Sequence, residues 1–246
     1  MALDEWLLAT APARPPVLRL YGWRSPTVSL GRHEPWREVV DPAKLEAAGV
    51  ALVRRPTGGR AVLHHDEMTY SVTADLNDAG PWREGLNVTL ARISGALSRG
   101  LRALGVNALF APANRASQRA TGHRLCFEST TRFELKSEGM KAVGSAQYRT
   151  EKGFLQHGSI PLRPTLMELW SLGPGKAPCP QDPGLPESLR RCSGIPPADM
   201  ARSLAGGFEE EFEMTGQWVG SQFVDLAFVD NLAESKYASA AWTFRR

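Results

Sequence analysis

The chain has 246 residues, of which 42% are hydrophobic and 22% charged, and these proportions exclude a disordered or collagen-like protein. No apolar run approaches the roughly 18 residues of a membrane span, so we expect none. The first residues lack the basic and then apolar pattern of a secretory signal, which predicts a cytoplasmic location. A net charge of +3 does not indicate nucleic-acid binding and is compatible with an acidic protein partner.

The three cysteines are Cys126, Cys179 and Cys192, an odd number without a C-x-x-C pair. This spacing favours free thiols over a disulfide framework or a structural zinc site.

Short strands and turns dominate the first half of the chain. Asp41 and Pro42 form a good N-cap and N1 pair for a helix that ends at Gly49. The alternating and β-branched segments predict strands over residues 17–21, 27–30, 50–53, 61–63 and 68–73.

The clearest helix is predicted over residues 87–104. Apolar residues recur there at steps of three and four, Asn87 can cap the start, and Gly105 ends the helix. Further strands are predicted over residues 106–110, 133–137, 140–148 and 153–162. The segment 173–198 is rich in Pro and Gly and predicts a loop or surface excursion.

A last helical stretch follows Pro196 and Pro197 and leads into a C-terminal helical tail. Strands and helices alternate irregularly, with several adjacent strands. The pattern predicts an α+β protein with mixed β-sheets flanked by helices, in one domain over residues 1–246, and not a doubly wound nucleotide fold.

The segment Arg54-Arg55-Pro56-Thr57-Gly58-Gly59-Arg60 lies between two predicted strands. It combines three guanidinium groups with a turn whose glycines let a ligand approach backbone N–H groups. It matches neither a Walker P-loop nor a G-x-G-x-x-G fingerprint. An anion-binding loop and a basic turn in solvent are equally supported by this segment alone.

Histidines occur at three positions of interest. Adjacent side chains of a strand point to opposite faces, so His64 and His65 cannot chelate one metal ion, and no metal site is expected. One of them is expected to face a pocket beside the arginine loop. His157 interrupts an apolar strand, and a hydrogen-bonded core position is favoured over a pocket wall.

Cys126 precedes Lys141 by fifteen positions. A lone cysteine is most often a small buried apolar residue. However, a nearby ammonium lowers the pKa of a thiol, and a lysine that has lost its own proton can accept that of the thiol. The Gly144-Ser145-Ala146 segment leaves backbone N–H groups open to an acyl oxygen. A bend between residues 127 and 140 would bring the thiol and the amine together.

In this order and spacing, the segments resemble the lipoate and biotin protein ligase superfamily. The resemblance covers about residues 2–245 and implies the catalytic fold of that superfamily, which is similar to class II synthetases. The matching segments are the opening strands (20–31), the substrate-cradling motif (54–71), Lys-x-x-Gly-Ser-Ala-Gln (141–147), the His-Gly strand (154–160) and the C-terminal Lys236-Tyr237 and Trp242.

Within the superfamily, the segment from Cys126 to Lys141 is similar to the cysteine-dependent octanoyltransferase branch. Arg60 stands where ATP-dependent ligases typically have a third glycine, and His65 stands where many relatives carry Asp. The resemblance implies that octanoyl passes from octanoyl-acyl carrier protein to Cys126, and then to a lysine of a lipoyl domain or the glycine cleavage H protein. No cofactor, metal or ATP is implied.

The same resemblance implies Cys126 and Lys141 as the catalytic residues. It implies substrate binding by Arg54, Arg55, Thr57, Gly58, Gly59, Arg60, His64, Tyr70, Gly144, Ser145, Ala146, Gln147, His157 and Gly158. The apolar walls around the acyl chain are expected from Val62, Leu63, Tyr70 and Val143. The three arginines are expected to meet the acidic surface or the phosphopantetheine phosphate of the carrier.

Three alternatives remain at this point. An ATP-dependent lipoate-protein ligase shares the fold and the lysine motif. An amidotransferase would move octanoyl between carrier proteins by the same cysteine chemistry. A non-catalytic acyl-binding protein would keep the pocket without needing Cys126 or Lys141.

Overall fold

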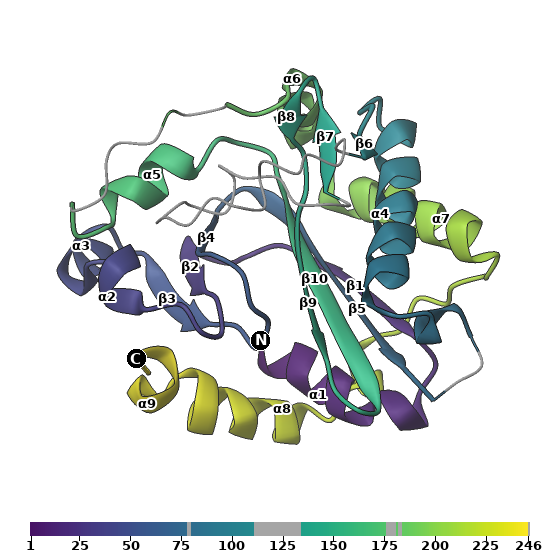
Figure 1. Cartoon of the computed structure of the whole chain (residues 1–246), viewed down its shortest axis with the longest axis horizontal. Coiled ribbons are helices and arrows are strands. Elements are labelled where there is room, and N and C mark those ends of the chain that lie inside the picture. The colour runs from purple at the N-terminus through teal and green to yellow at the C-terminus, as the bar shows by residue number, and fades with distance from the viewer. Residues whose placement is uncertain (78–79, 111–133, 176–180, 182–183, 246) are drawn as a thin grey trace.

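The computed structural model describes residues 1–77, 80–110, 134–175, 181 and 184–245. Three β-sheets and the helices around them form the fold (Figure 1). The main sheet is antiparallel and has the order β1 (Val17–Tyr21), β5 (Glu67–Asp75), β10 (Gly153–Pro161), β9 (Gly144–Arg149). The α+β expectation is confirmed, and β1 has the predicted bounds.

Two smaller sheets flank the main one. The first has the order β3 (Ala51–Arg54), β2 (Thr27–Leu30), β4 (Val62–His64), with β2 parallel to β3 and antiparallel to β4. The second is antiparallel, with the order β6 (Leu109–Phe110), β7 (Leu135–Ser137), β8 (Met140–Lys141).

The two faces of the main sheet differ in chemistry because side chains alternate along a strand. On β5, Tyr70, Val72 and Ala74 lie in the larger hydrophobic core, together with Ile93 and Leu97 of a covering helix. The intervening residues of β5 are polar and buried, namely Thr69, Ser71 and Thr73. The sheet therefore has one apolar face against helices and one polar face available for a site.

Helices α4 (Leu86–Ala103) and α7 (Pro197–Phe212) cover the apolar face and pack against each other (Figure 1). Their backbones approach closely through glycines. A Cβ on Gly207 would lie 2.3 Å from the carbonyl oxygen of Ala96, and one on Gly100 would lie 2.7 Å from the Cα of Leu204. The helix pair depends on this absence of side chains.

A matched pair of neighbouring glycines tests this packing. We expect Gly207→Ala to lower the free energy of unfolding by about 1–3 kcal/mol, because the new methyl overlaps backbone that cannot move aside cheaply. A Cβ on the exposed Gly206 meets nothing within 4 Å, so Gly206→Ala should stabilise the helix by up to about 1 kcal/mol. Urea unfolding of both variants measures the difference, and equal effects would contradict the close packing.

The smaller mixed sheet has its own hydrophobic core. Three short helices surround it, namely α2 (Trp36–Val39), α3 (Pro42–Ala47) and α5 (Leu166–Ser171). Asp41 caps α3 by accepting from the N–H of Ala43, as its sequence predicts. Leu30 of β2 and Leu63 of β4 are fully buried in this core. Their burial holds the two strands in place, and the alternate polar side chains of these strands face the main sheet.

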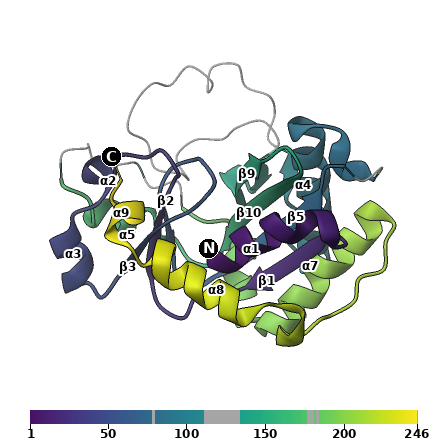
Figure 2. The same cartoon turned by 90° about the horizontal axis from the view of Figure 1, so that it is seen from below.

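Segments from the two ends of the chain lie at the bottom of the view in Figure 1 and face the viewer in Figure 2. They are α1 (Ala2–Thr10), α8 (Leu226–Leu232), a π-helical turn (Ala233–Tyr237) and α9 (Ala240–Thr243). Lys236 donates to both carboxylate oxygens of Glu5 at 2.7 Å, and the indole of Trp242 donates to the carbonyl of Arg54 at 2.8 Å. The C-terminal segment thus joins α1 to the end of β3.

Several sequence predictions need correction. The predicted loop 173–198 contains α6 (Glu187–Arg191) and a 3-10 turn (Cys192–Gly194), because Leu189 and Cys192 are buried in the larger core. The predicted strand 140–148 is divided between two sheets, as β8 and β9. The cap of α4 is Gly85, and Asn87 lies inside the helix. Of the helices described, none is long and apolar enough to cross a membrane.

Candidate functional site

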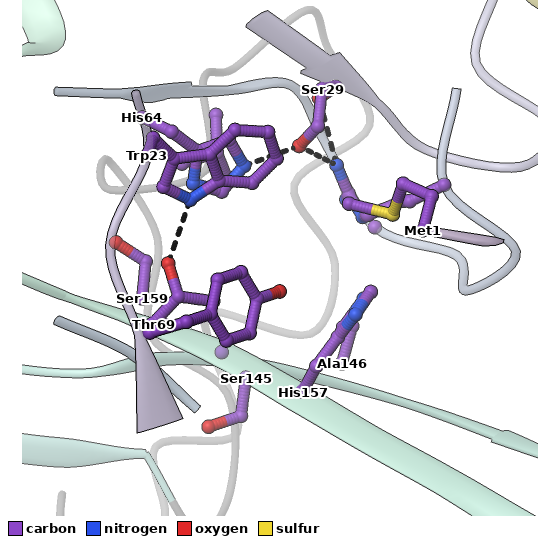
Figure 3. Close-up of a pocket in the computed structure, with 15 residues that line it drawn as sticks. Met1, Trp23, Ser29, His64, Thr69, Ser145, Ala146, His157 and Ser159 are labelled. Atoms are coloured by element: carbon purple, nitrogen blue, oxygen red, sulfur yellow. Dashed lines mark hydrogen bonds between the residues drawn. The ribbon is translucent and has the colours of Figure 1, made fainter. Parts of the chain in front are cut away.

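A pocket lies between the polar face of the main sheet and the smaller mixed sheet (Figure 3). The space in it, including the solvent at its open mouth, is about 450 Å³. The sequence-predicted residues that line it are Arg55, Gly59, His64, Gly144, Ser145, Ala146, His157 and Gly158. Val62, expected as an apolar wall, also lines it.

Strand register brings three sequence-distant motifs to this place. Gly158 of β10 lies between Tyr70 of β5 and Ser145 of β9, and Ser159 lies between Thr69 and Gly144. The motif with the tyrosine, the Gly-Ser-Ala motif and the His-Gly motif are therefore adjacent in the sheet, although up to about ninety residues separate them in the chain.

Two glycines are required here by close approach. A Cβ on Gly158 would lie 2.2 Å from the carbonyl oxygen of Gly144 and 2.5 Å from the ring of Tyr70. A Cβ on Gly31, just after β2, would lie 1.8 Å from the carbonyl oxygen of Gly59. Because Gly31 has no Cβ, the arginine loop can fold tightly against the end of β2.

His64 is buried and faces the pocket, as expected for one of the two adjacent histidines. Its Nε2 lies 2.7 Å from Oγ of Ser29, its Nδ1 lies 2.8 Å from Glu67, and its ring stacks on Trp23 at 4.2 Å (Figure 3). His65 instead contacts Arg163, so the two imidazoles have different partners. Within the described ranges, no cluster of His, Cys, Asp or Glu could hold a metal ion.

His157 is both buried and part of the pocket wall. Its Nε2 lies 2.6 Å from Oγ1 of Thr57, and its Nδ1 lies 3.6 Å from the fully buried carboxylate of Asp4. Burial lowers the pKa of His157, which keeps the imidazole neutral. Despite its burial, the Asp4 carboxyl has a pKa well below its usual range, chiefly because of the Arg19 guanidinium.

The expected surface role of two arginines is wrong. Arg54 is fully buried and donates to the carbonyl oxygens of Gly31, Glu34 and Thr243. Arg55 is nearly as buried and donates to carbonyls of its own loop and of Ser29. Both guanidinium groups hold backbone together, so neither presents a charge to the surface of a partner. Arg60 is half-buried, and its carbonyl is one of the oxygens that Arg55 holds.

Three expected apolar walls are also placed elsewhere. Leu63 lies in the core of the smaller sheet, and Tyr70 and Val143 lie in the larger core. The hydroxyl of Tyr70 is 2.7 Å from Oγ of Ser145 and accepts from Gln156 at 3.0 Å. Tyr70 therefore supports the pocket from behind the sheet, and Gln147 joins the same network by donating to Gln156 at 2.9 Å.

Sequence reasoning missed several residues that line the pocket, namely Met1, Tyr21, Trp23, Ser29, Thr69 and Ser159. It also missed Glu67, whose carboxylate accepts from His64, Thr69 and Ser159. The alternation of polar residues along β5 was the available signal, because Glu67 and Thr69 share one face of the strand.

Lys141 is buried on β8, and its ammonium donates to Glu134 at 2.7 Å. Both side chains are at least nine-tenths buried, so this is an interior ion pair. Cys126, the expected nucleophile, and Cys179 lie outside the described residues. Thr57 touches the pocket through His157, and Gly58 is held by Arg55 through its carbonyl oxygen.

Residues 1–190 match the family model of the lipoyl protein ligase A/B catalytic domain. The chain belongs to this family, which confirms the expected superfamily and fold. Solved structures agree on the fold at low sequence identity. A putative lipoate protein ligase from T. acidophilum with bound lipoic acid has a TM-score of 0.73, 20% identity, and coverage of 99% of this chain and 92% of the other. Lipoate-protein ligase A bound with ATP has a TM-score of 0.76, with the same identity and coverage.

Among curated proteins, the chain is similar to octanoyltransferases named LipM. That of Carboxydothermus hydrogenoformans is 34% identical over 257 residues, covering 100% of this chain and 93% of the relative. That of Kyrpidia tusciae is 47% identical over 167 residues, covering 65% of this chain and 60% of the relative. The first similarity extends beyond the family domain to the whole chain.

Proposed function

We propose that this chain is an octanoyltransferase that moves octanoyl from octanoyl-acyl carrier protein to a lysine of a lipoyl domain or of the glycine cleavage H protein. The observation that carries the proposal is the similarity over the whole chain to proteins named octanoyltransferase LipM. The pocket supports the proposal, because Trp23, Tyr21 and Val62 offer apolar surface for an acyl chain beside polar groups that can hydrogen-bond a thioester.

In the proposed first step, the Cys126 thiolate attacks the thioester carbon of the donor. A new C–S bond forms, the old C–S bond breaks, and the carrier sulfur leaves as a thiol that takes up the proton that Cys126 has lost. The Lys141 ammonium, oriented by Glu134, favours the thiolate electrostatically. Backbone N–H groups of the Gly58-Gly59 turn would stabilise the oxyanion.

In the second step, the acceptor lysine attacks the acyl-enzyme and an amide forms. A thioester is a higher-energy acyl compound than an amide, so the transfer runs downhill and needs no ATP, cofactor or metal. The protein would act in the cytoplasm as a single catalytic domain over residues 1–246.

The test is transfer from purified octanoyl-acyl carrier protein to a purified lipoyl domain without ATP. We expect octanoylation of one acceptor lysine, detected by mass spectrometry. The control reaction supplies free octanoate with ATP and should give no product. Product only in the control reaction would mean an ATP-dependent ligase, and transfer only from an octanoylated H protein would mean an amidotransferase.

A further inference from the structure

Two polar side chains of the pocket wall, Ser29 and His64, and the buried Glu67 behind them are arranged like the hydroxyl, base and acid of a catalytic triad. Ser29 comes from β2, His64 from the end of β4, and Glu67 from the start of β5. The distances from Ser29 Oγ to His64 Nε2 and from His64 Nδ1 to Glu67 are 2.7 and 2.8 Å. Such an arrangement is recognised by geometry and roles and not by sequence order.

Among the described residues, His64 is the only basic side chain that pairs with Glu67. Its carboxylate is buried and accepts from His64 and from the hydroxyls of Thr69 and Ser159, and within the described chain no lysine or arginine pairs with it. Desolvation opposes ionisation, but His64 and the hydroxyl donors outweigh it, so the pKa of Glu67 lies below its usual value. The buried carboxylate lies against Nδ1 of His64, the position that the acid of a triad takes.

The remaining neighbours of His64 fit the same role. With Nδ1–H donated to Glu67, Nε2 is free to accept the proton of the Ser29 hydroxyl. Trp23 stacks on the ring, a contact that favours a cation over a neutral ring. The Arg55 guanidinium donates to Ser29 Oγ at 3.2 Å, so the oxygen keeps a hydrogen bond while its proton moves.

The second histidine of the pocket lacks these features. The Asp4 carboxylate is 3.6 Å from His157 and forms an ion pair with Arg19. The arginine therefore neutralises much of the negative charge that faces the imidazole. Burial lowers the pKa of His157, which makes it a poorer proton acceptor. The two arrays therefore differ in their carboxylates. Asp4 is paired with an arginine, whereas Glu67 is hydrogen-bonded to the histidine itself.

We propose that Ser29, His64 and Glu67 form a proton relay that deprotonates the acceptor lysine for attack on the acyl-enzyme. The inference deepens the proposed function and rests on it. The lysine ammonium gives one proton to Ser29 Oγ as the Ser29 proton passes to His64 Nε2. The free amine then forms the C–N bond, the C–S bond breaks, and the second N–H proton leaves on the enzyme thiol. Ser29 is the catalytic contact, and Glu67 is a positioning residue.

The relay matters because a lysine side chain is mostly protonated at neutral pH. With a pKa of about 10.4, roughly one amine in a thousand is unprotonated near pH 7.4. A positioned base typically contributes about 10²–10⁴-fold to such a step. Hydroxylamine is already unprotonated at this pH and needs no base, so it separates base catalysis from the rest of the site.

The experiment follows one turnover of pre-formed octanoyl-enzyme with a lipoyl domain or with hydroxylamine, at pH 7 and pH 9. For His64→Gln we expect normal acylation and an unchanged rate with hydroxylamine. The rate with the lipoyl-domain lysine should fall about 10²–10³-fold at pH 7. At pH 9 that rate, relative to wild type, should recover by at least about tenfold. Glu67→Gln and Ser29→Ala should show the same pattern to a smaller degree, and they keep the test valid if His64→Gln does not fold.

His65→Gln is the matched control, because the neighbouring imidazole contacts Arg163 and lies outside the pocket lining. It should behave as wild type. Three results would each overturn the relay. The first is an equal loss of rate with lysine and with hydroxylamine, and the second is no loss of rate with lysine. The third is a loss with lysine alone in His157→Gln instead of in His64→Gln. Failure of wild type to become octanoylated would overturn the proposed function, and the relay with it.

Discussion

Replacing Lys141 with methionine should reduce octanoyl transfer by at least about 10³-fold and also destabilise the protein. The ammonium that favours the thiolate is lost, and Glu134 is left buried without its cation. Breaking a buried ion pair in this way typically costs about 3–5 kcal/mol. Transfer rates and urea unfolding of the same preparation measure the two effects.

A double variant separates catalysis from stability. Lys141→Met with Glu134→Gln removes both charges, so most of the stability should return while transfer stays absent. Lys236→Met is a control for loss of an ion-paired lysine, since the Lys236 and Glu5 side chains are about a quarter and a third exposed and such pairs contribute at most about 1 kcal/mol. A double variant with normal transfer would show that the Lys141 pair is structural only.

The second large effect is expected at Gly158. Alanine there would place a methyl 2.2 Å from the Gly144 carbonyl and 2.5 Å from the ring of Tyr70, so β9 or β5 must shift. Overpacking of this kind costs about 1–3 kcal/mol. Because the same strands carry Ser145 and Thr69 into the pocket, transfer should fall about 10²-fold, in line with the effect of a 1 Å misplacement.

Gly194→Ala is the matched control for that substitution, because a Cβ on Gly194 meets nothing within 4 Å. It should leave transfer and the urea midpoint close to wild type. Normal transfer by Gly158→Ala would place the reaction away from this pocket.

Local patterns carried much of the fold prediction. The apolar period over residues 87–104 predicts α4 to within one residue at each end, and β1 and β2 have their predicted bounds. Helix α1 was not predicted, since no side chain caps it. It is held by distant partners, among them Lys236 on Glu5 and Arg19 on Asp4. A helix stabilised by tertiary contacts of this separation leaves little local signal.

The candidate site shows the same division. The motif around Gly58 and the histidine at position 64 were expected at a pocket, because glycine turns and histidines have local chemical meaning. The burial of Arg54 was not, since it depends on carbonyl groups at residues 31, 34 and 243. Tyr70 was assigned to the pocket although strand alternation places it on the opposite face from Thr69.

The most direct test of the account is the intact mass of the protein after mixing with octanoyl-acyl carrier protein, without ATP. Wild type should gain one octanoyl group, Cys126→Ala should gain none, and Cys192→Ala should gain one, because Cys192 is a buried core residue. The account is contradicted if wild type gains no adduct and an acceptor domain is modified only with ATP and free octanoate or lipoate. That result would make the protein a ligase and Cys126 a structural residue.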